Sequence, residues 1–104
     1  MDRTGDTVLK LVSDFLEILQ RSDVRLEEAY LYGSHAVGRA RPDSDIDVAL
    51  VSDDFGDWLE DRRRIVDALL SSDVRIEAVR FRPEEFRDEN PLVWEIKTKG
   101  IKLL

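Results

Sequence analysis

The sequence predicts a single α/β (α+β) layer domain spanning residues 1–104. Two observations carry this prediction. Segments with helical spacing of apolar residues alternate along the chain with short segments in which apolar and polar residues alternate. Hydrophobic residues make up 42% of the sequence and charged residues 38%, which is apolar enough for one modest core and too apolar for a disordered chain.

The N-terminal half is expected to form a helix, two strands and the turn between them. Apolar residues at helical spacing predict a helix that ends near Gln20. Alternation then predicts a strand over Leu26–Tyr32, and Gly33-Ser34 predicts a tight turn directly after it. We expect a short helix over His35–Gly38, a loop, and a second strand over Asp45–Val51.

The C-terminal half is expected to add two helices and a third strand. Helical spacing predicts a helix over Phe55–Leu70, and alternation predicts a strand over Val74–Phe81. A short helix is expected over Pro83–Phe86, a last helix over Leu92–Lys99, and an edge strand over Ile101–Leu104. In the second helix, Glu60, Asp61 and Arg62 to Arg64 are expected in solvent, and the buried side is expected to hold Trp58, Leu59, Ile65, Val66, Leu69 and Leu70.

Charge and composition exclude several classes of function. The net charge of −7 argues against extensive binding to nucleic acid or to an anionic membrane, and is compatible with metal ions and a basic protein partner. The absence of cysteine excludes disulfides, thiolate metal sites and cysteine nucleophiles, and fits a cytoplasmic protein. We find no signal-peptide pattern and no apolar run near the ~20 residues of a membrane span.

The stretch from Leu31 to Val51 carries the chemistry. Asp45 and Asp47 share one face of the second strand, because side chains alternate with a period of two. Two acids on a mostly apolar strand repel each other and are costly unless a cation lies between them. The Gly33-Ser34 turn ahead of them offers backbone N–H groups and a hydroxyl to an anion. A divalent metal beside a phosphate is the arrangement needed for phosphoryl or nucleotidyl transfer.

A third carboxylate is expected on the next strand. Glu77 is the best candidate, since it lies in mid-strand among apolar residues. The alternative interpretation is a surface salt bridge with Arg75 or Arg80. Glu84 and Glu85 are poorer candidates, because a helix N-terminus favours acids without any catalytic role.

The motifs together resemble a known family. Gly33-Ser34, Gly38 and Ser44-Asp45-Ile46-Asp47 match the pattern GS-x(3)-G-x(5)-SDxD. The chain therefore resembles nucleotidyltransferases of the DNA polymerase beta-like superfamily, and most closely the minimal nucleotidyltransferase (MNT) family. The later VRIEAV and KGIKLL segments follow in the expected order, so the resemblance covers most of the chain.

The resemblance implies a fold and a reaction. The fold would be a short mixed β-sheet with helices packed mainly on one face. The reaction would be a transfer of AMP from ATP that depends on two Mg²⁺ ions. The third carboxylate would help to deprotonate the acceptor hydroxyl. By this resemblance the catalytic and metal-binding residues are Asp45, Asp47 and Glu77, and the nucleotide-binding residues are Gly33, Ser34 and Ser44.

The resemblance also implies a partner. Many family members are antitoxins of HEPN-type ribonuclease toxins, and some attach AMP to a tyrosine of the toxin, so a homo- or hetero-oligomer is expected. Two alternatives stay open: neutralisation of a toxin by binding alone, and nucleotide transfer to RNA or a small molecule. The family often has Arg where Val37 stands, and Arg39 or Arg41 is the candidate replacement. Trp58 and Trp94 are expected in the core, with anchoring of a partner as the alternative.

Overall fold

A four-stranded mixed sheet forms the middle of the molecule. The computed structural model describes residues 3–73 and 75–104. Strands β1 (Glu28–Tyr32), β2 (Ile46–Val51), β3 (Ile76–Phe81) and β4 (Ile101–Lys102) lie in the order β3-β2-β1-β4. Strand β1 runs antiparallel to β2 and β4, whereas β2 and β3 are parallel. The predicted α+β class and mixed sheet are confirmed. Val74, the first residue of the predicted third strand, lies outside the described residues.

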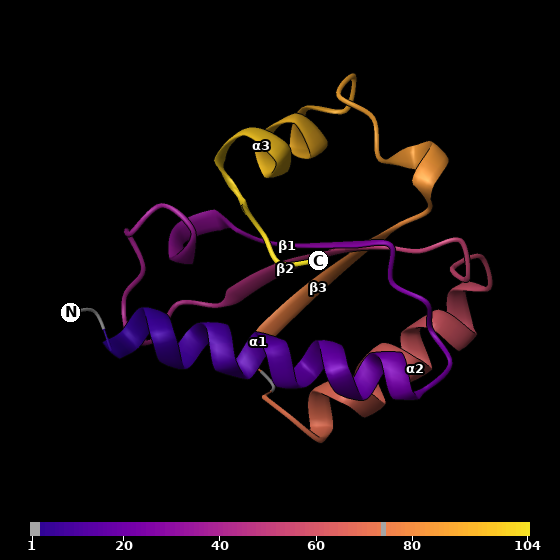
Figure 1. The fold of residues 1–104 in the computed structure, drawn as a ribbon, viewed down its shortest axis with the longest axis horizontal. Helices are drawn as coiled ribbons and strands as arrows, with labels where there is room; N and C mark the ends of the chain where they lie inside the picture. Colours follow the sequence, from indigo (N-terminus) through magenta and orange to yellow (C-terminus); the bar gives the residue numbers. More distant parts are fainter. Residues whose placement is uncertain (1–2, 74) are drawn as a thin grey trace.

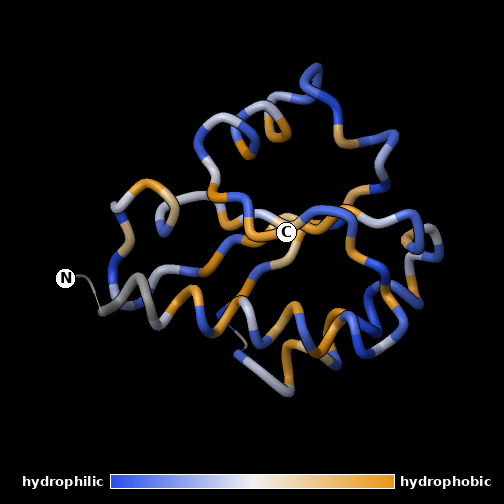
Figure 2. The backbone as a smooth tube through the Cα atoms, viewed as in Figure 1, coloured by the Kyte–Doolittle hydropathy of each residue, from blue (hydrophilic) through white to orange (hydrophobic). Residues whose placement is uncertain are grey.

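Two helices cover one face of this sheet. Helices α1 (Arg3–Arg21) and α2 (Trp58–Leu70) lie side by side on it (Figure 1). Hydrophobic segments recur along α1 and alternate with hydrophilic ones in the strands, as Figure 2 shows. In this core, α1 and the strands follow the predicted periodicities, whereas α2 does so only in part. It includes Val12, Phe15 and Leu19 of α1, Ile65 and Ala68 of α2, and Leu31, Ile46, Val48, Leu50 and Ile76 of the sheet.

A third helix covers the opposite face. Helix α3 (Pro91–Lys99) follows the 3₁₀ turn η2 (Pro83–Glu85), and both lie across the sheet from α1 (Figure 1). Among the described residues, no helix is both long and apolar enough to cross a membrane. Because α1 and α2 cover one face of the sheet and α3 the other, the helices lie mainly, but not wholly, on one face. The smaller core under α3 contains Tyr30, Ala49, Val51, Phe81, Phe86, Val93 and Ile96.

The strand register aligns polar residues on the α3 side of the sheet. Tyr32 of β1 pairs with Asp47 of β2, and Asp47 pairs with Glu77 of β3. Residues directly opposite one another in neighbouring strands point to the same face. The three side chains therefore form one row across the sheet, at the end where β2 and β3 begin.

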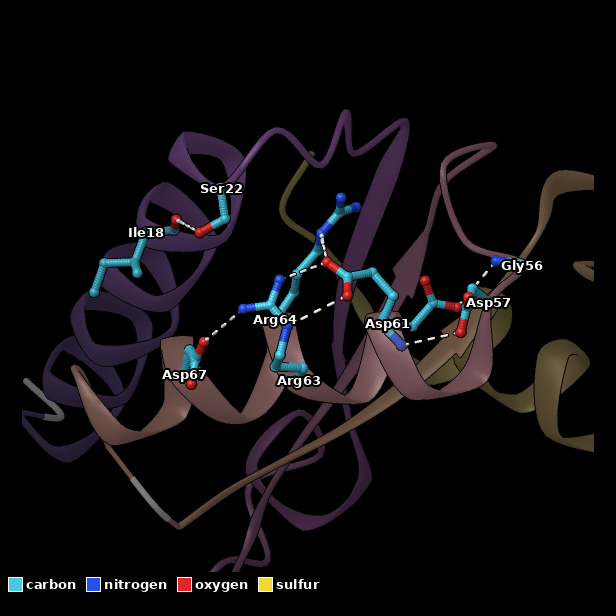
Figure 3. A network of polar contacts seen from close by, with 9 residues as sticks. Ile18, Ser22, Gly56, Asp57, Asp61, Arg63, Arg64 and Asp67 are labelled. Atoms are coloured by element: carbon cyan, nitrogen blue, oxygen red, sulfur yellow. Dashed lines mark hydrogen bonds and ion pairs between the residues drawn. The ribbon is translucent and has the colours of Figure 1, made fainter.

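Helix α2 differs from the prediction in the side that it buries. Asp61, expected in solvent, is 1% exposed. The side chains expected to be buried that are exposed include Trp58 (58%), Leu59 (69%), Val66 and Leu70 of α2, and Trp94 of α3. Asp61 Oδ2 accepts a hydrogen bond from Gly56 N at 2.9 Å and lies 3.6 Å from Arg80 Nη1. Figure 3 shows this start of the helix, where the Asp57 side chain accepts from the third residue of α2, Glu60 N. The polar partners of Asp61 explain why the helix is rotated to bury it.

Candidate active site

The Gly33-Ser34 turn follows β1 directly, as predicted. It forms a single 3₁₀ turn, η1 (Gly33–His35), in which Ala36 N donates to Gly33 O at 3.1 Å. The short helix expected at His35–Gly38 therefore begins earlier and ends earlier. Gly33 has φ of +74°, a left-handed conformation that favours glycine and lets the chain turn at once.

Gly33 also lies directly against Asp47. A Cβ atom on Gly33 would overlap Asp47 Oδ2. The pairing of Tyr32 with Asp47 across β1 and β2 brings the turn and the carboxylate to this contact. The turn that could hold a phosphate and the carboxylate that could hold a metal thus share one small region.

The acidic residues lie at neighbouring positions. Asp45 is exposed just before β2, Asp47 is half-buried on β2, and Glu77 is exposed at the paired position of β3. Burial raises the pKa of Asp47, and the charge of Asp45 raises it further, whereas His35 lowers it. Arg75 pairs with Asp73 at 2.9 Å, and Arg80 pairs with Asp61. These are the two arginines with which Glu77 forms a surface salt bridge in the alternative interpretation.

The donor set suits a hard divalent cation. Within residues 3–73 and 75–104, no three His, Asp or Glu side chains gather closely enough to hold a metal ion by themselves. Mg²⁺ commonly takes one or two carboxylates and completes its shell with water and substrate phosphates. Asp45 and Asp47, two close carboxylates whose repulsion a cation would relieve, fit that requirement.

A pocket of about 440 Å³ opens beside the turn. Gly33, Ser34 and Arg39 line one side, and Glu95 and Lys99 of α3 line the other. Glu95 and Lys99 are four residues apart and so are neighbours on one helix face. Arg39, one of the two candidate replacements for the family arginine, lies on this pocket, as does Val37 itself.

Ser44 supports the loop that leads into β2. Its Oγ accepts a hydrogen bond from Arg41 N at 2.8 Å, and its carbonyl oxygen lies 3.4 Å from His35 Nε2. These contacts tie residues 41–44 to the η1 turn. The nucleotide-binding role of Ser44 stays a prediction.

Sequence reasoning missed two residues of this region. Tyr32 is half-buried, and its pKa is raised by burial and then by the charges of Asp47, Glu77 and Glu95. The alternation of β1 against β2 was the signal that could have placed it beside Asp47. Lys99 lines the pocket, although a lysine in the last turn of a helix has an ordinary explanation in the helix dipole.

The glycine-serine turn against the strand carboxylates brings groups that can bind a phosphate next to groups that can bind a divalent cation, the combination that phosphoryl transfer uses. The chain belongs to the polymerase beta nucleotidyltransferase family, whose model matches residues 13–104. It is therefore a nucleotidyltransferase, and the resemblance stated from the sequence is confirmed. A search of the curated proteins returned no match.

Solved structures share the fold. A candidate nucleotidyltransferase from Sulfolobus solfataricus has a TM-score of 0.64 at 21% identity, covering 94% of this chain and 80% of that one. A toxin–antitoxin structure with AMP-PNP has a TM-score of 0.58 at 24% identity, covering 86% and 70%. A mutant of the toxin–antitoxin MntA-HpeT has a TM-score of 0.56 at 18% identity, covering 96% and 72%. At these identities the likeness shows the fold.

Proposed function

We propose that this protein transfers AMP from ATP, with Mg²⁺, to a hydroxyl of a partner protein, foremost a tyrosine of a HEPN-type toxin, and so acts as the antitoxin in the cytoplasm. The observation that carries the proposal is the contact between Gly33 and the Asp47 carboxylate beside a pocket lined by Arg39 and Lys99. Anion-binding and cation-binding groups meet there, as a metal–nucleotide substrate requires.

The nucleotide would lie with its phosphates at the turn. The backbone N–H groups near Gly33 and the Ser34 hydroxyl donate to phosphate oxygens, and Lys99 and Arg39 add positive charge. Asp45 and Asp47 would hold Mg²⁺, which supplies charge neutralisation on the phosphates and activates the attacking oxygen. The pocket volume of about 440 Å³ is within the range of small-molecule sites.

The acceptor hydroxyl attacks the α-phosphorus in line with the bond to the β-phosphate. A new oxygen–phosphorus bond forms, the bond from the α-phosphorus to the bridging oxygen breaks, and pyrophosphate leaves. Glu77, exposed beside Asp47, takes the proton of the acceptor hydroxyl. Tyr32, whose raised pKa keeps its phenol protonated, can donate a hydrogen bond at the same end of the sheet.

Three observations support a toxin as the partner. The MNT-like motifs are those of a family rich in antitoxins, and two of the structures that share the fold are toxin–antitoxin assemblies. The acidic net charge of −7 also suits a basic protein better than RNA.

The test uses the protein encoded by the gene next to that of this protein as the candidate partner, and measures the transfer of a labelled phosphate from ATP to it. The two proteins are incubated with Mg²⁺ and ATP labelled on the α-phosphate or on the γ-phosphate. Label from the α-phosphate alone should join the partner, with a mass increase of one AMP. Asp45→Asn/Asp47→Asn should abolish labelling, whereas Asp53→Asn, an exposed acid beyond the opposite end of β2, should not change it.

The same variants separate the proposal from neutralisation by binding alone. If the wild-type protein leaves the partner unlabelled and Asp45→Ala/Asp47→Ala still neutralises the toxin, the protein acts by covering its partner. Labelling of RNA or of a small molecule in place of the partner would identify the other alternative.

A further inference from the structure

A groove lies between α2 and the outer edge of β3, away from the pocket at Gly33. Its volume is about 580 Å³, and Trp58, Arg62, Val66, Ala78 and Arg80 are among its lining residues. Strand β3 is an edge strand, because it is the first in the order β3-β2-β1-β4. The groove therefore joins a helix surface to an open sheet edge.

The backbone of β3 offers hydrogen bonds along this edge. Arg75 O accepts from Ile46 N at 2.9 Å, and Phe81 O accepts from Ser52 N at 3.0 Å, so these two residues direct their carbonyls toward β2. In a parallel pair, alternate residues direct their N–H and C=O groups to opposite sides. Ala78 and Arg80 therefore turn their backbone groups outward, where another extended chain can pair with them.

The helix side of the groove is apolar and aromatic. Trp58 and Val66 are exposed, and the Arg62 guanidinium lies 5.6 Å from the centre of the Trp58 ring. A neighbouring face of α2 is charged and not apolar. Arg63 and Arg64, both labelled in Figure 3, form ion pairs there with Glu60, at 2.5 and 3.3 Å respectively.

The charge of the groove indicates what it binds. Arg80 pairs with buried Asp61, and Glu77 adds a negative charge to the lining, so the cation that the groove presents in this acidic protein is Arg62 beside Trp58. Tryptophan and arginine are among the residue types most enriched at the hot spots of protein interfaces. The occupant that fits is an extended peptide with an apolar side chain for Trp58 and an acidic one near Arg62.

The groove is continuous with the row of polar side chains formed by Tyr32, Asp47 and Glu77. Glu77 lines it and also pairs with Asp47 across β2 and β3. We propose that an extended, acidic and apolar segment of the acceptor protein adds as a strand to β3, anchors on Trp58, and so brings its acceptor hydroxyl to Glu77. This inference rests on the proposed function, since it names where that reaction's protein substrate binds.

The test measures binding and transfer separately, with the adjacent gene's product as probe. Trp58→Ser should weaken binding of that protein by on the order of tenfold or more in calorimetry, and raise its KM equally, with the KM for ATP unchanged. Leu59→Ser is the matched control, because Leu59 is exposed on the same turn of α2 and does not line the groove. Ala78→Pro, which removes an outward N–H and leaves the bonds to β2, should act as Trp58→Ser does.

The outcomes distinguish the two proposals. Transfer by the wild type that neither Trp58→Ser nor Ala78→Pro impairs would overturn the groove and leave the proposed function standing. Absence of transfer with a binding loss specific to Trp58→Ser would overturn the proposed function and keep the groove as the partner site. A wild-type dimer that Trp58→Ser converts to a monomer would show that a second copy fills the groove, which also overturns this inference. Thermal unfolding of each variant checks that it is folded.

Discussion

Gly33 and the Asp47 carboxylate are in direct contact, so that any side chain at Gly33 would overlap Asp47 Oδ2. The contact joins two parts of the motif that lie fourteen positions apart in the chain (33 to 47). Glycine is needed here for two separate reasons, the left-handed backbone and the nearness of the carboxylate. Gly38 has the same φ of +74°, but a Cβ atom there would meet no atom of the described residues within 4 Å, so the two reasons can be separated.

We predict that Gly33→Ala destabilises the protein more than Gly38→Ala. Each variant carries the backbone cost of about 1–2 kcal/mol, and Gly33→Ala adds an overlap cost of about 1–3 kcal/mol. Urea unfolding measures both. Gly33→Ala/Asp47→Ala should recover the overlap cost, and equal destabilisation by the two glycine variants would contradict the contact.

Asp47→Asn should raise stability while it removes activity. The folded state raises the pKa of Asp47, so its ionised form is unfavourable at neutral pH, and the amide removes that charge. We expect a melting temperature a few degrees higher, and transfer lower by roughly a hundredfold or more. Mg²⁺ should stabilise the wild type more than the variant. A lower melting temperature in Asp47→Asn without metal would show that the carboxylate is not under electrostatic strain.

Local rules explain what could be predicted from the sequence. A Gly-Ser pair directly after an alternating segment predicts a turn, and a period of two places Asp45 and Asp47 on one side of a strand in any fold. The turn, the α+β class and the order of elements followed from such rules. The pairing of Glu77 with Asp47 needed strand order as well, which the sequence pattern alone does not determine.

Tertiary neighbours explain the rest. Asp61 is polar and lies among charged residues, so its burial depends on Gly56 N and Arg80, which only the fold brings to it. Trp58 is exposed because α2 turns Asp61, Ile65 and Ala68 inward. Lys99 reaches the pocket because α3 crosses back beside β1, a placement no local period reveals.

Lys99→Gln should weaken nucleotide binding and leave stability nearly unchanged. The exposed ammonium lines the pocket beside Ser34, and a charge-assisted hydrogen bond to phosphate contributes about 1.5–3 kcal/mol. We therefore expect the Kd for ATP with Mg²⁺ to rise by about tenfold or more in calorimetry. Lys10→Gln, on the exposed side of α1, is the matched loss of charge and should bind ATP as the wild type does. Equal affinity of the two variants would place the phosphates elsewhere.

Asp61→Ala should destabilise the protein much more than Asp67→Ala. Removal of the buried carboxylate leaves Gly56 N without its acceptor and Arg80 without its partner, at a cost of about 1–3 kcal/mol. Asp67 is exposed on the same helix, 3.7 Å from Arg63, and its loss should cost less than about 0.5 kcal/mol. Urea unfolding of both variants compares them. Equal costs would mean that Asp61 contributes no more than a surface residue.

Tyr30 should make the protein sensitive to alkali. Its hydroxyl donates to Glu28 Oε1 at 2.9 Å. Burial, that hydrogen bond and the charge of Glu28 raise the pKa of Tyr30 from 10.0 to about 12. The unfolded chain loses the phenol proton first, so the stability that Tyr30 contributes is complete below pH 10 and is lost as the pH rises toward about 12.

Tyr30→Phe tests this directly. The variant should be less stable at neutral pH by about 0.5–1.5 kcal/mol, because the hydrogen bond to Glu28 is lost. Above pH 10 the difference should shrink, since the phenylalanine has no proton to lose. Thermal unfolding over this pH range, together with the ultraviolet absorbance of the phenolates, measures both effects. Tyr32 remains in the variant with a raised pKa and accounts for the residual pH dependence. Stability curves that stay parallel from neutral pH to pH 12 would show that Tyr30 titrates alike in the folded and unfolded chains.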